Sequence, residues 1–272
     1  MQRVAIGALV APNDGVMRLV DGPSVLLADP HGVDGMWTAV GDDVTHLVLL
    51  GERRHEALVR RHAALVSDRG IAVSWRVVPH GPAAVVVLAL KIASYEMDAG
   101  LLPALVDQFA ARMWSGAWMP SVARLEDPAP SLLQHLRSWL PTGAGFLVML
   151  SGEPGVARVG APAGPARAGH SPSSLICAGV AIPQLAIRDA LGRSGAEDTV
   201  VVPELNLDPR GRFGSARAVE IVGLPLGNDI RLPRPESLPR CVVCAAVMPA
   251  DFCTYCHVRS VRASVELQGD QL

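Results

Sequence analysis

The sequence predicts an α/β fold in which a parallel or mixed sheet is flanked by helices, with a small zinc ribbon near the C-terminus. Short apolar runs bounded by Gly, Pro, Asp or Asn alternate with segments of helical periodicity, which favours an α/β body. Many of these runs lack a polar residue at every second position, as is typical of strands covered on both faces. Four of the five cysteines lie between residues 241 and 256, in two pairs, which indicates a metal-binding module.

Eight apolar segments are predicted to be strands, because each is short and is bounded by turn-forming residues. They are residues 3–11, 24–28, 46–51, 71–78, 83–90, 145–150, 199–203 and 218–224. The longest apolar stretch, PAAVVVLAL at 82–90, has about half the length needed to cross a bilayer.

Four segments place apolar residues at three- and four-residue steps, which predicts helices. They are residues 52–70, 101–114, 131–140 and 183–192. Ser131 is a suitable N-cap for the third helix, and Gly70 and Gly192 are suitable ends for the first and the fourth.

Composition predicts how the chain is divided. A first α/β lobe is expected at 1–150, followed by a Gly- and Pro-rich loop or linker at 151–174. A smaller α/β segment at 175–225 could complete the same domain. A Pro-rich connector at 226–240 then leads to the zinc ribbon at 241–260 and a C-terminal tail at 261–272.

The charge balance narrows the function classes. Hydrophobic residues make up 50% of the chain and charged residues 18%, with a formal net charge of -2, so neither a general nucleic-acid binder nor a membrane-surface binder is indicated. The N-terminus lacks the long apolar region and the cleavage site of a secretory signal. A cytoplasmic location is therefore expected, and there paired cysteines are more often metal ligands than disulfides.

The cysteine spacing indicates a zinc site. Cys241, Cys244, Cys253 and Cys256 give the pattern C-x2-C-x8-C-x2-C, in which two tight turns can direct four sulfurs at one ion. Four thiolates favour zinc over hard cations and suggest a closed structural site. So short a unit has too little core to fold alone, so metal binding would supply on the order of 10 kcal/mol of its folding free energy.

The segment CVVCAAVMPADFCTYCH resembles the short zinc ribbons common in bacterial proteins, which share its cysteines, Ala246, Met248, Pro249 and Phe252. The resemblance implies a structural zinc ion held by the four cysteines. Ala245 and His257 stand where that family usually has glycines, so one turn could be distorted or could use His257 as a substitute ligand. An iron site, a haem attachment at CTYCH and a redox pair are the alternatives.

Catalytic candidates are weaker. Asp29 with His31, and Asp42 or Asp43 with His46, lie near predicted strand ends, where α/β folds often place active sites, and either pair could form a general base.

With one sharp metal site and no clear catalytic constellation, the leading hypothesis is a non-enzymatic protein whose ribbon, on a Pro-rich tether, docks a protein partner or mediates self-association. The first alternative is an enzyme with its site at the sheet edge of the first lobe and a purely structural zinc. The second is nucleic-acid binding through the ribbon, which Arg240, Arg259 and Arg262 flank. No membrane partner is expected.

Overall fold

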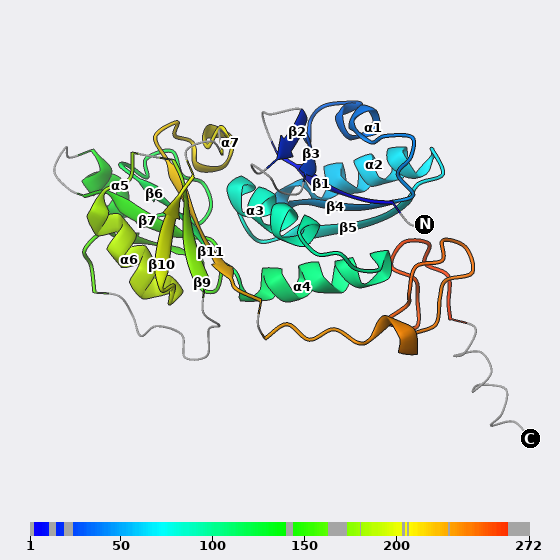
Figure 1. Cartoon of the computed structure of the whole chain (residues 1–272). Helices are drawn as coiled ribbons and strands as arrows, with labels where there is room; N and C mark the ends of the chain where they lie inside the picture. Colours follow the sequence, from blue (N-terminus) through cyan, green and yellow to red (C-terminus); the bar gives the residue numbers. More distant parts are fainter. Residues whose placement is uncertain are drawn as a thin grey trace, which may run out of the picture.

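The computed structural model describes residues 3–10, 15–18, 24–139, 144–162, 173–179, 181–202, 205, 207–227 and 229–260. In this part of the chain two sheets lie with helices between them and on their outer faces (Figure 1). The predicted α/β class, with parallel and mixed strand pairing and flanking helices, is confirmed.

Among the described residues, the first sheet has five strands in the order β2-β3-β1-β4-β5. Its strands are β1 (Val4–Leu9), β2 (Gly15–Arg18), β3 (Ser24–Ala28), β4 (His46–Glu52) and β5 (Ala72–Val78). All neighbouring pairs are parallel except β2 with β3. The carboxyl ends of β3, β1, β4 and β5 therefore share one edge, which is where open α/β sheets commonly bind ligands.

Both faces of this sheet are covered, which explains its continuous apolar strands. One face packs against α1 (Gly35–Ala39) and against α2 (Glu56–Ser67), which follows the short η1 (Arg53–His55). The other packs against α3 (Pro82–Ala93) and α4 (Leu102–Arg112), the latter preceded by η2 (Ala99–Leu101) (Figure 1).

The strand predicted at 83–90 is wrong, because these residues form the helix α3. Pro82 occupies an early helical position, where its missing N–H costs nothing. The helix contacts both β1 of the first sheet and β11 (Val219–Pro225) of the second. A helix buried on all sides needs no polar face, so its sequence cannot be distinguished from a buried strand by periodicity.

In the described part of the chain, the second sheet has six strands in the order β10-β9-β11-β6-β7-β8, of which only β9 and β10 pair in parallel. Besides β11 it contains β6 (Trp114–Met119), β7 (Phe146–Met149), β8 (Gly155–Arg158), β9 (Ser173–Ala178) and β10 (Asp198–Val201). It takes strands from both sides of the Gly- and Pro-rich segment 151–174, and β8 lies within that segment. The division of the chain into domains stays a prediction.

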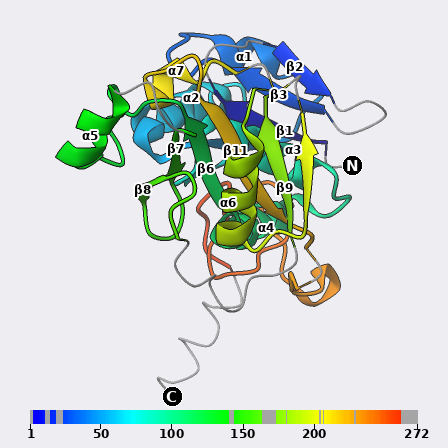
Figure 2. The same cartoon turned by 90° about the vertical axis from the view of Figure 1, so that its left-hand side faces the viewer.

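Within the ranges that the structure describes, three helices accompany the second sheet. They are α5 (Leu132–Ser138), α6 (Gln184–Ser194) and α7 (Arg210–Phe213). The α6 helix covers the face turned away from α3 (Figure 2). As predicted, Ser131 caps α5, and it forms a capping box with Gln134.

The cysteine segment follows η3 (Pro235–Ser237) and lies beside the start of α4 (Figure 1). Five residues of this segment belong to the same buried cluster as α3 and α4: Cys241, Ala246, Met248, Cys253 and Tyr255. Within the described residues, no helix combines the length and the hydrophobicity that crossing a bilayer requires.

Candidate functional site

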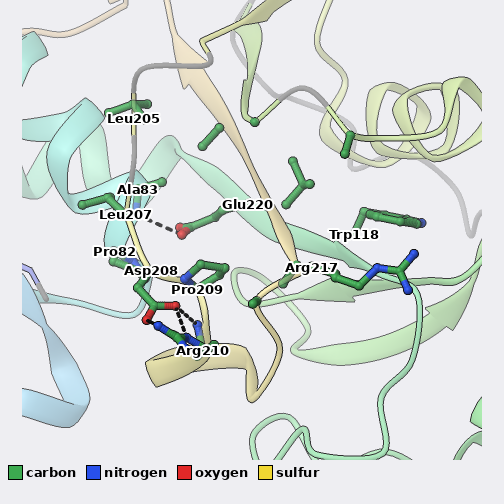
Figure 3. Close-up of a pocket in the computed structure, with 16 residues that line it drawn as sticks. Pro82, Ala83, Trp118, Leu205, Leu207, Asp208, Pro209, Arg210, Arg217 and Glu220 are labelled. Atoms are coloured by element: carbon green, nitrogen blue, oxygen red, sulfur yellow. Dashed lines mark hydrogen bonds and ion pairs between the residues drawn. The ribbon is translucent and has the colours of Figure 1, made fainter. Parts of the chain in front are cut away.

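A cavity of about 600 Å³ lies between the start of α3 and the second sheet, a size typical of small-molecule sites (Figure 3). Pro82 and Ala83 line it from α3, and Ala178 and Glu220 line it from β9 and β11. The segment before α7 closes one side with Leu207 and its neighbours. Twelve of the sixteen residues that line the cavity are apolar or glycine, and the other four are charged.

Glu220 is a buried carboxyl group in this wall, and Figure 3 shows its side chain pointing from β11 towards α3. It accepts hydrogen bonds from the backbone amides of Ala83 (2.9 Å) and Ala84 (3.1 Å) at the start of the helix. Burial raises the pKa of Glu220 to about 8, and the nearby charge of Glu52 acts in the same direction. The two amides and Arg212 lower the pKa, but burial outweighs them, so the group is largely protonated at neutral pH.

Two arginines also line the cavity. Arg210 pairs with Asp208, whose carboxylate accepts from Arg210 Nε at 2.9 and 2.7 Å, so its charge is largely compensated. Arg217 is exposed, and among the described residues its guanidinium has neither an ion pair nor a hydrogen bond. Arg217 is therefore the cation in this wall that remains open to an anionic ligand.

The cysteine cluster is the second candidate site. The four sulfur atoms of Cys241, Cys244, Cys253 and Cys256 lie within 4.8 Å of one another, and those of Cys244 and Cys253 are 3.6 Å apart. A tetrahedron with metal–sulfur bonds of about 2.3 Å places its sulfurs about 3.8 Å apart. These residues could therefore hold a metal ion as predicted, and His257 is not part of the group.

The two cysteine turns repeat one backbone pattern. In the first turn, the amide of Ala245 donates to the carbonyl of Cys241 at 2.9 Å. In the second turn, the amide of His257 donates to the carbonyl of Cys253 at 2.9 Å. Ala245 has φ 62° and His257 has φ 57°, which is the left-handed region. Similar ribbons carry glycine at these two positions. The two turns therefore have the backbone conformation that glycine adopts freely, and Ala245 and His257 adopt it with steric strain.

Polar contacts attach the ribbon to the body of the protein. The Asp98 carboxylate accepts from the amide of Val247 (3.0 Å) and from Arg240 (2.8 Å). The Tyr255 hydroxyl donates to the carbonyl of Ala99 (2.8 Å), and its ring meets that of His46 edge to face at 5.1 Å. The ribbon is therefore part of the folded body and does not stand apart on a tether.

The structure places the two predicted catalytic pairs at opposite edges of the first sheet, and within the first pair the amide of His31 donates to the Asp29 carboxylate at 2.9 Å. Asp29 and His31 follow β3 at the carboxyl edge of the first sheet, whereas Asp42 precedes β4 and His46 begins it at the opposite edge. Asp42 pairs with Arg69, and His46 is buried against Tyr255. None of these four side chains lines the cavity described above.

The charged residues proposed for nucleic-acid binding are only partly described. The Arg240 guanidinium is engaged by Asp98 and by the carbonyl of Ala245 at 2.8 Å. Arg259 is exposed, and Arg262 lies outside the described residues.

Sequence reasoning did not find Glu220, Arg210 or Arg217. One signal was present: Glu220 is a carboxylate inside the apolar run AVEIVGL, which was predicted to be a strand. A carboxyl group that is buried within a strand needs either a hydrogen-bonding or charged partner or a raised pKa. Both features are common in binding sites.

No protein-family model and no curated protein sequence matches this chain. The described fold resembles that of a DegV family protein from Eubacterium eligens, whose crystal structure is loaded with heptadecanoic acid. The TM-score is 0.55 at 12% identity, and the match covers 82% of this chain and 100% of that one. The two chains therefore share a fold.

Two further structures show a weaker likeness. A DegV family protein from Corynebacterium glutamicum has a TM-score of 0.48 at 10% identity, over 85% of this chain and 98% of that one. The dihydroxyacetone kinase from C. freundii has a TM-score of 0.48 at 14% identity, over 84% of this chain and 49% of that one. Neither score is high enough to assign a fold.

The expectation of a protein that docks partners through its zinc ribbon is wrong. The main body, to which that hypothesis gave no role, has a DegV-like fold and a cavity of ligand size. The ribbon is buried against this body through Ala246, Met248 and Tyr255. The cysteine cluster is therefore a part of the architecture of this body.

Proposed function

We propose that this protein binds one long-chain carboxylate, such as a fatty acid, in the cavity between α3 and the second sheet. The carrying observation is the cavity itself, in which a mostly apolar wall is combined with one uncompensated arginine and one protonated carboxyl group. The shared fold with a protein whose structure holds heptadecanoic acid supports the same class of ligand.

The apolar wall would hold the alkyl chain. Apolar side chains from four separate parts of the chain line the cavity: Ala83, Trp118, Ala178, and Leu205 with Leu207. Each methylene group that leaves water for such a surface contributes about 0.8 kcal/mol. A chain of a dozen or more methylene groups would therefore supply most of the binding free energy.

The charged groups would orient the ligand. Arg217 can pair with a carboxylate, and guanidinium–carboxylate pairs are strong because two N–H groups can donate in parallel. Glu220, when protonated, can donate its O–H to an anion. An ionised Glu220 would instead repel it, so the raised pKa of Glu220 suits an anionic ligand.

The test is a titration of the full-length protein with hexadecanoic acid and, in parallel, with hexadecanol, which has the same chain and no carboxylate. We expect tight binding of the acid and binding at least about tenfold weaker for the alcohol, a difference of 1.4 kcal/mol. Arg217→Gln should lower the affinity for hexadecanoic acid about tenfold and leave the affinity for hexadecanol unchanged. Arg188→Gln, an exposed arginine of α6 outside the cavity, is the matched control.

Equal affinity for the acid and the alcohol would contradict the proposed role of the charged groups. Ala178→Trp, which fills the cavity from β9, should abolish binding of both. If both ligands still bind to that variant, the cavity is not the site.

For the cysteine cluster, we propose that Cys241, Cys244, Cys253 and Cys256 hold one structural zinc ion. The convergence of four sulfurs to distances that suit a tetrahedron supports this choice, and so does the lack of an open ligand position. The zinc ion would fix the two turns in place, and four unoxidised thiolates suit the reducing interior of a cell. Elemental analysis of the purified protein tests the proposal, since iron in place of zinc, or no metal, would refute it.

A further inference from the structure

A second cavity, of about 320 Å³, lies at the carboxyl edge of the first sheet. Its floor is made by the ends of β4 and β5, where Glu52 and Val78 are the last strand residues. Its walls come from the loops around Asp127 and Pro154 and from Arg212 in α7. The wall carries five charged groups, and none of the residues proposed to bind the alkyl chain lines it.

Two carboxylates and two of the three arginines in this cavity neutralise one another. Glu52 is buried and accepts from Arg54 Nε at 3.0 Å and Nη2 at 2.9 Å, and Arg212 Nε lies 3.8 Å from it. Arg212 also donates to the Asp127 carboxylate at 3.1 Å and to its carbonyl at 2.9 Å. This network fixes the position of both guanidinium groups.

Arg53 is the third arginine, and its charge is not compensated. It is exposed, and among the described residues its side chain has no hydrogen bond or ion pair. Its neighbour in the wall, His80, donates from Nε2 to the Ala110 carbonyl at 2.9 Å and accepts the Ser115 hydroxyl at Nδ1 at 2.9 Å. Burial, with a smaller effect from Arg53, lowers the pKa of His80, so this ring is neutral and cannot offset or add to the charge.

The cavity therefore has an excess of one positive charge, because three guanidinium groups face two carboxylates. The continuous helical segment of η1 and α2 begins at the same edge, and the start of a helix favours anions. Each guanidinium group has five N–H groups. Arg54 uses three of them, two for Glu52 and one, from Nη1, for the carbonyl of Gly211. Arg212 uses two of them for Asp127. In the part of the chain that the structure describes, each of the three arginines therefore keeps N–H groups without a partner.

We propose that this second cavity binds a phosphate group, either as the free ion or as the monoester of a small molecule. A tetrahedral anion with several acceptor oxygens suits the fork-shaped donors of Arg53 together with the N–H groups that Arg54 and Arg212 do not use for Glu52, Gly211 and Asp127. The volume accommodates the phosphate and a small organic group attached to it. This site is separate from the proposed fatty-acid cavity and does not depend on it.

The test uses the full-length protein with phenyl phosphate and inorganic phosphate as probes, and with benzoate as the carboxylate counterpart. Isothermal titration calorimetry is expected to show that both phosphates bind more tightly than benzoate. Added salt should lower the affinity for both phosphates. Arg53→Gln should reduce phenyl phosphate affinity about tenfold, as expected for the loss of one charge-assisted hydrogen bond. Arg61→Gln, an exposed arginine of α2 outside the cavity, should leave it unchanged.

Because Arg53 is exposed and unpaired, Arg53→Gln should unfold at the same temperature as the unchanged protein, so a loss of binding is not a loss of fold. Ala178→Trp, which fills the other cavity, should bind phenyl phosphate normally. Equal affinities of the Arg53 and Arg61 variants would overturn the proposal. So would the absence of phosphate binding in the millimolar range, or loss of phenyl phosphate binding in Ala178→Trp.

Discussion

The carboxyl group of Glu220 on β11 accepts a hydrogen bond of 2.9 Å from the backbone amide of Ala83 at the start of α3, 137 positions earlier in the chain. This bond joins the second sheet to the helix that covers the first sheet. It also places a buried acidic group in the wall of the larger cavity. The protonation of Glu220 should therefore affect both the stability of the fold and the affinity for an anionic ligand.

The first prediction concerns stability against pH. The folded protein keeps the Glu220 proton up to about pH 8, whereas the unfolded chain releases it near pH 4.5. Between these values the folded state binds more protons, so the free energy of unfolding falls as pH rises, by up to about 1.4 kcal/mol per pH unit. Glu220→Gln removes this group, so urea unfolding of the variant should lose less stability from pH 6 to pH 8. Parallel pH profiles of the two proteins would contradict the raised pKa.

The second prediction concerns ligand binding against pH. Above pH 8 the ionised Glu220 would repel a bound carboxylate, so the dissociation constant for hexadecanoic acid should rise by up to about tenfold per pH unit. Two charged groups, Glu52 and Arg212, act on Glu220, and two neutral backbone amides of α3 donate hydrogen bonds to it. Hexadecanol should show no such rise, and neither should the acid with Glu220→Gln. A rise for the alcohol as well would indicate unfolding of the site and not repulsion.

Much of the fold could be predicted from sequence, because local patterns decide local structure. The apolar runs that became β1, β4, β5 and β11 are bounded by turn residues, and the periodicity of α2 matches its buried face. The cysteine spacing alone predicted the cluster. By contrast, α3 was mistaken for a strand, since burial between two sheets removes the polar face by which a helix is recognised.

The cavities could not be predicted, because they are made by contacts between distant segments. Glu220 meets Ala83 and Ala84, and Arg212 meets Glu52, through the packing of two sheets whose order the sequence does not reveal. Asp29 and His46 both lie at strand ends, as predicted, but at opposite edges of one sheet. Strand direction, which decides which ends meet, is a property of the assembled sheet.

The third prediction uses the two left-handed residues of the ribbon. Ala245→Gly and His257→Gly should each raise the free energy of unfolding of the metal-loaded protein by about 0.5–1 kcal/mol, since glycine adopts positive φ without steric cost. The control is Ala246→Gly, which lies outside the positive-φ region and is fully buried, and which should destabilise. A loss of stability in both turn variants would mean that the side chains of Ala245 and His257 contribute more than their backbone strain costs.

The fourth prediction concerns metal removal. Because Tyr255, Ala246 and Met248 share a buried cluster with α3 and α4, stripping the metal with a chelator should lower the unfolding temperature of the whole protein. Cys253→Ser should have the same effect and should lower the metal content. Cys177→Ala, which changes a buried thiol in β9 outside the cluster, should keep the metal. An unchanged unfolding temperature after complete removal would show that the ribbon folds independently of the body.

The last prediction tests how closely the ribbon is fitted to the body. A Cβ atom at Gly100, in η2, would lie 1.8 Å from the carbonyl oxygen of Val247, and backbone atoms cannot turn aside as a side chain can. Gly100→Ala should therefore destabilise the protein by about 1–3 kcal/mol and weaken metal retention, because it pushes the ribbon away from α4. Gly192→Ala is the matched control: no atom lies within 4 Å of its Cβ, and within α6 alanine should stabilise by about 0.5–1 kcal/mol. Thermal unfolding and metal content distinguish the two variants, and equal behaviour would mean that the ribbon can shift without cost, so that its contacts with Asp98 and Ala99 do not hold it in place.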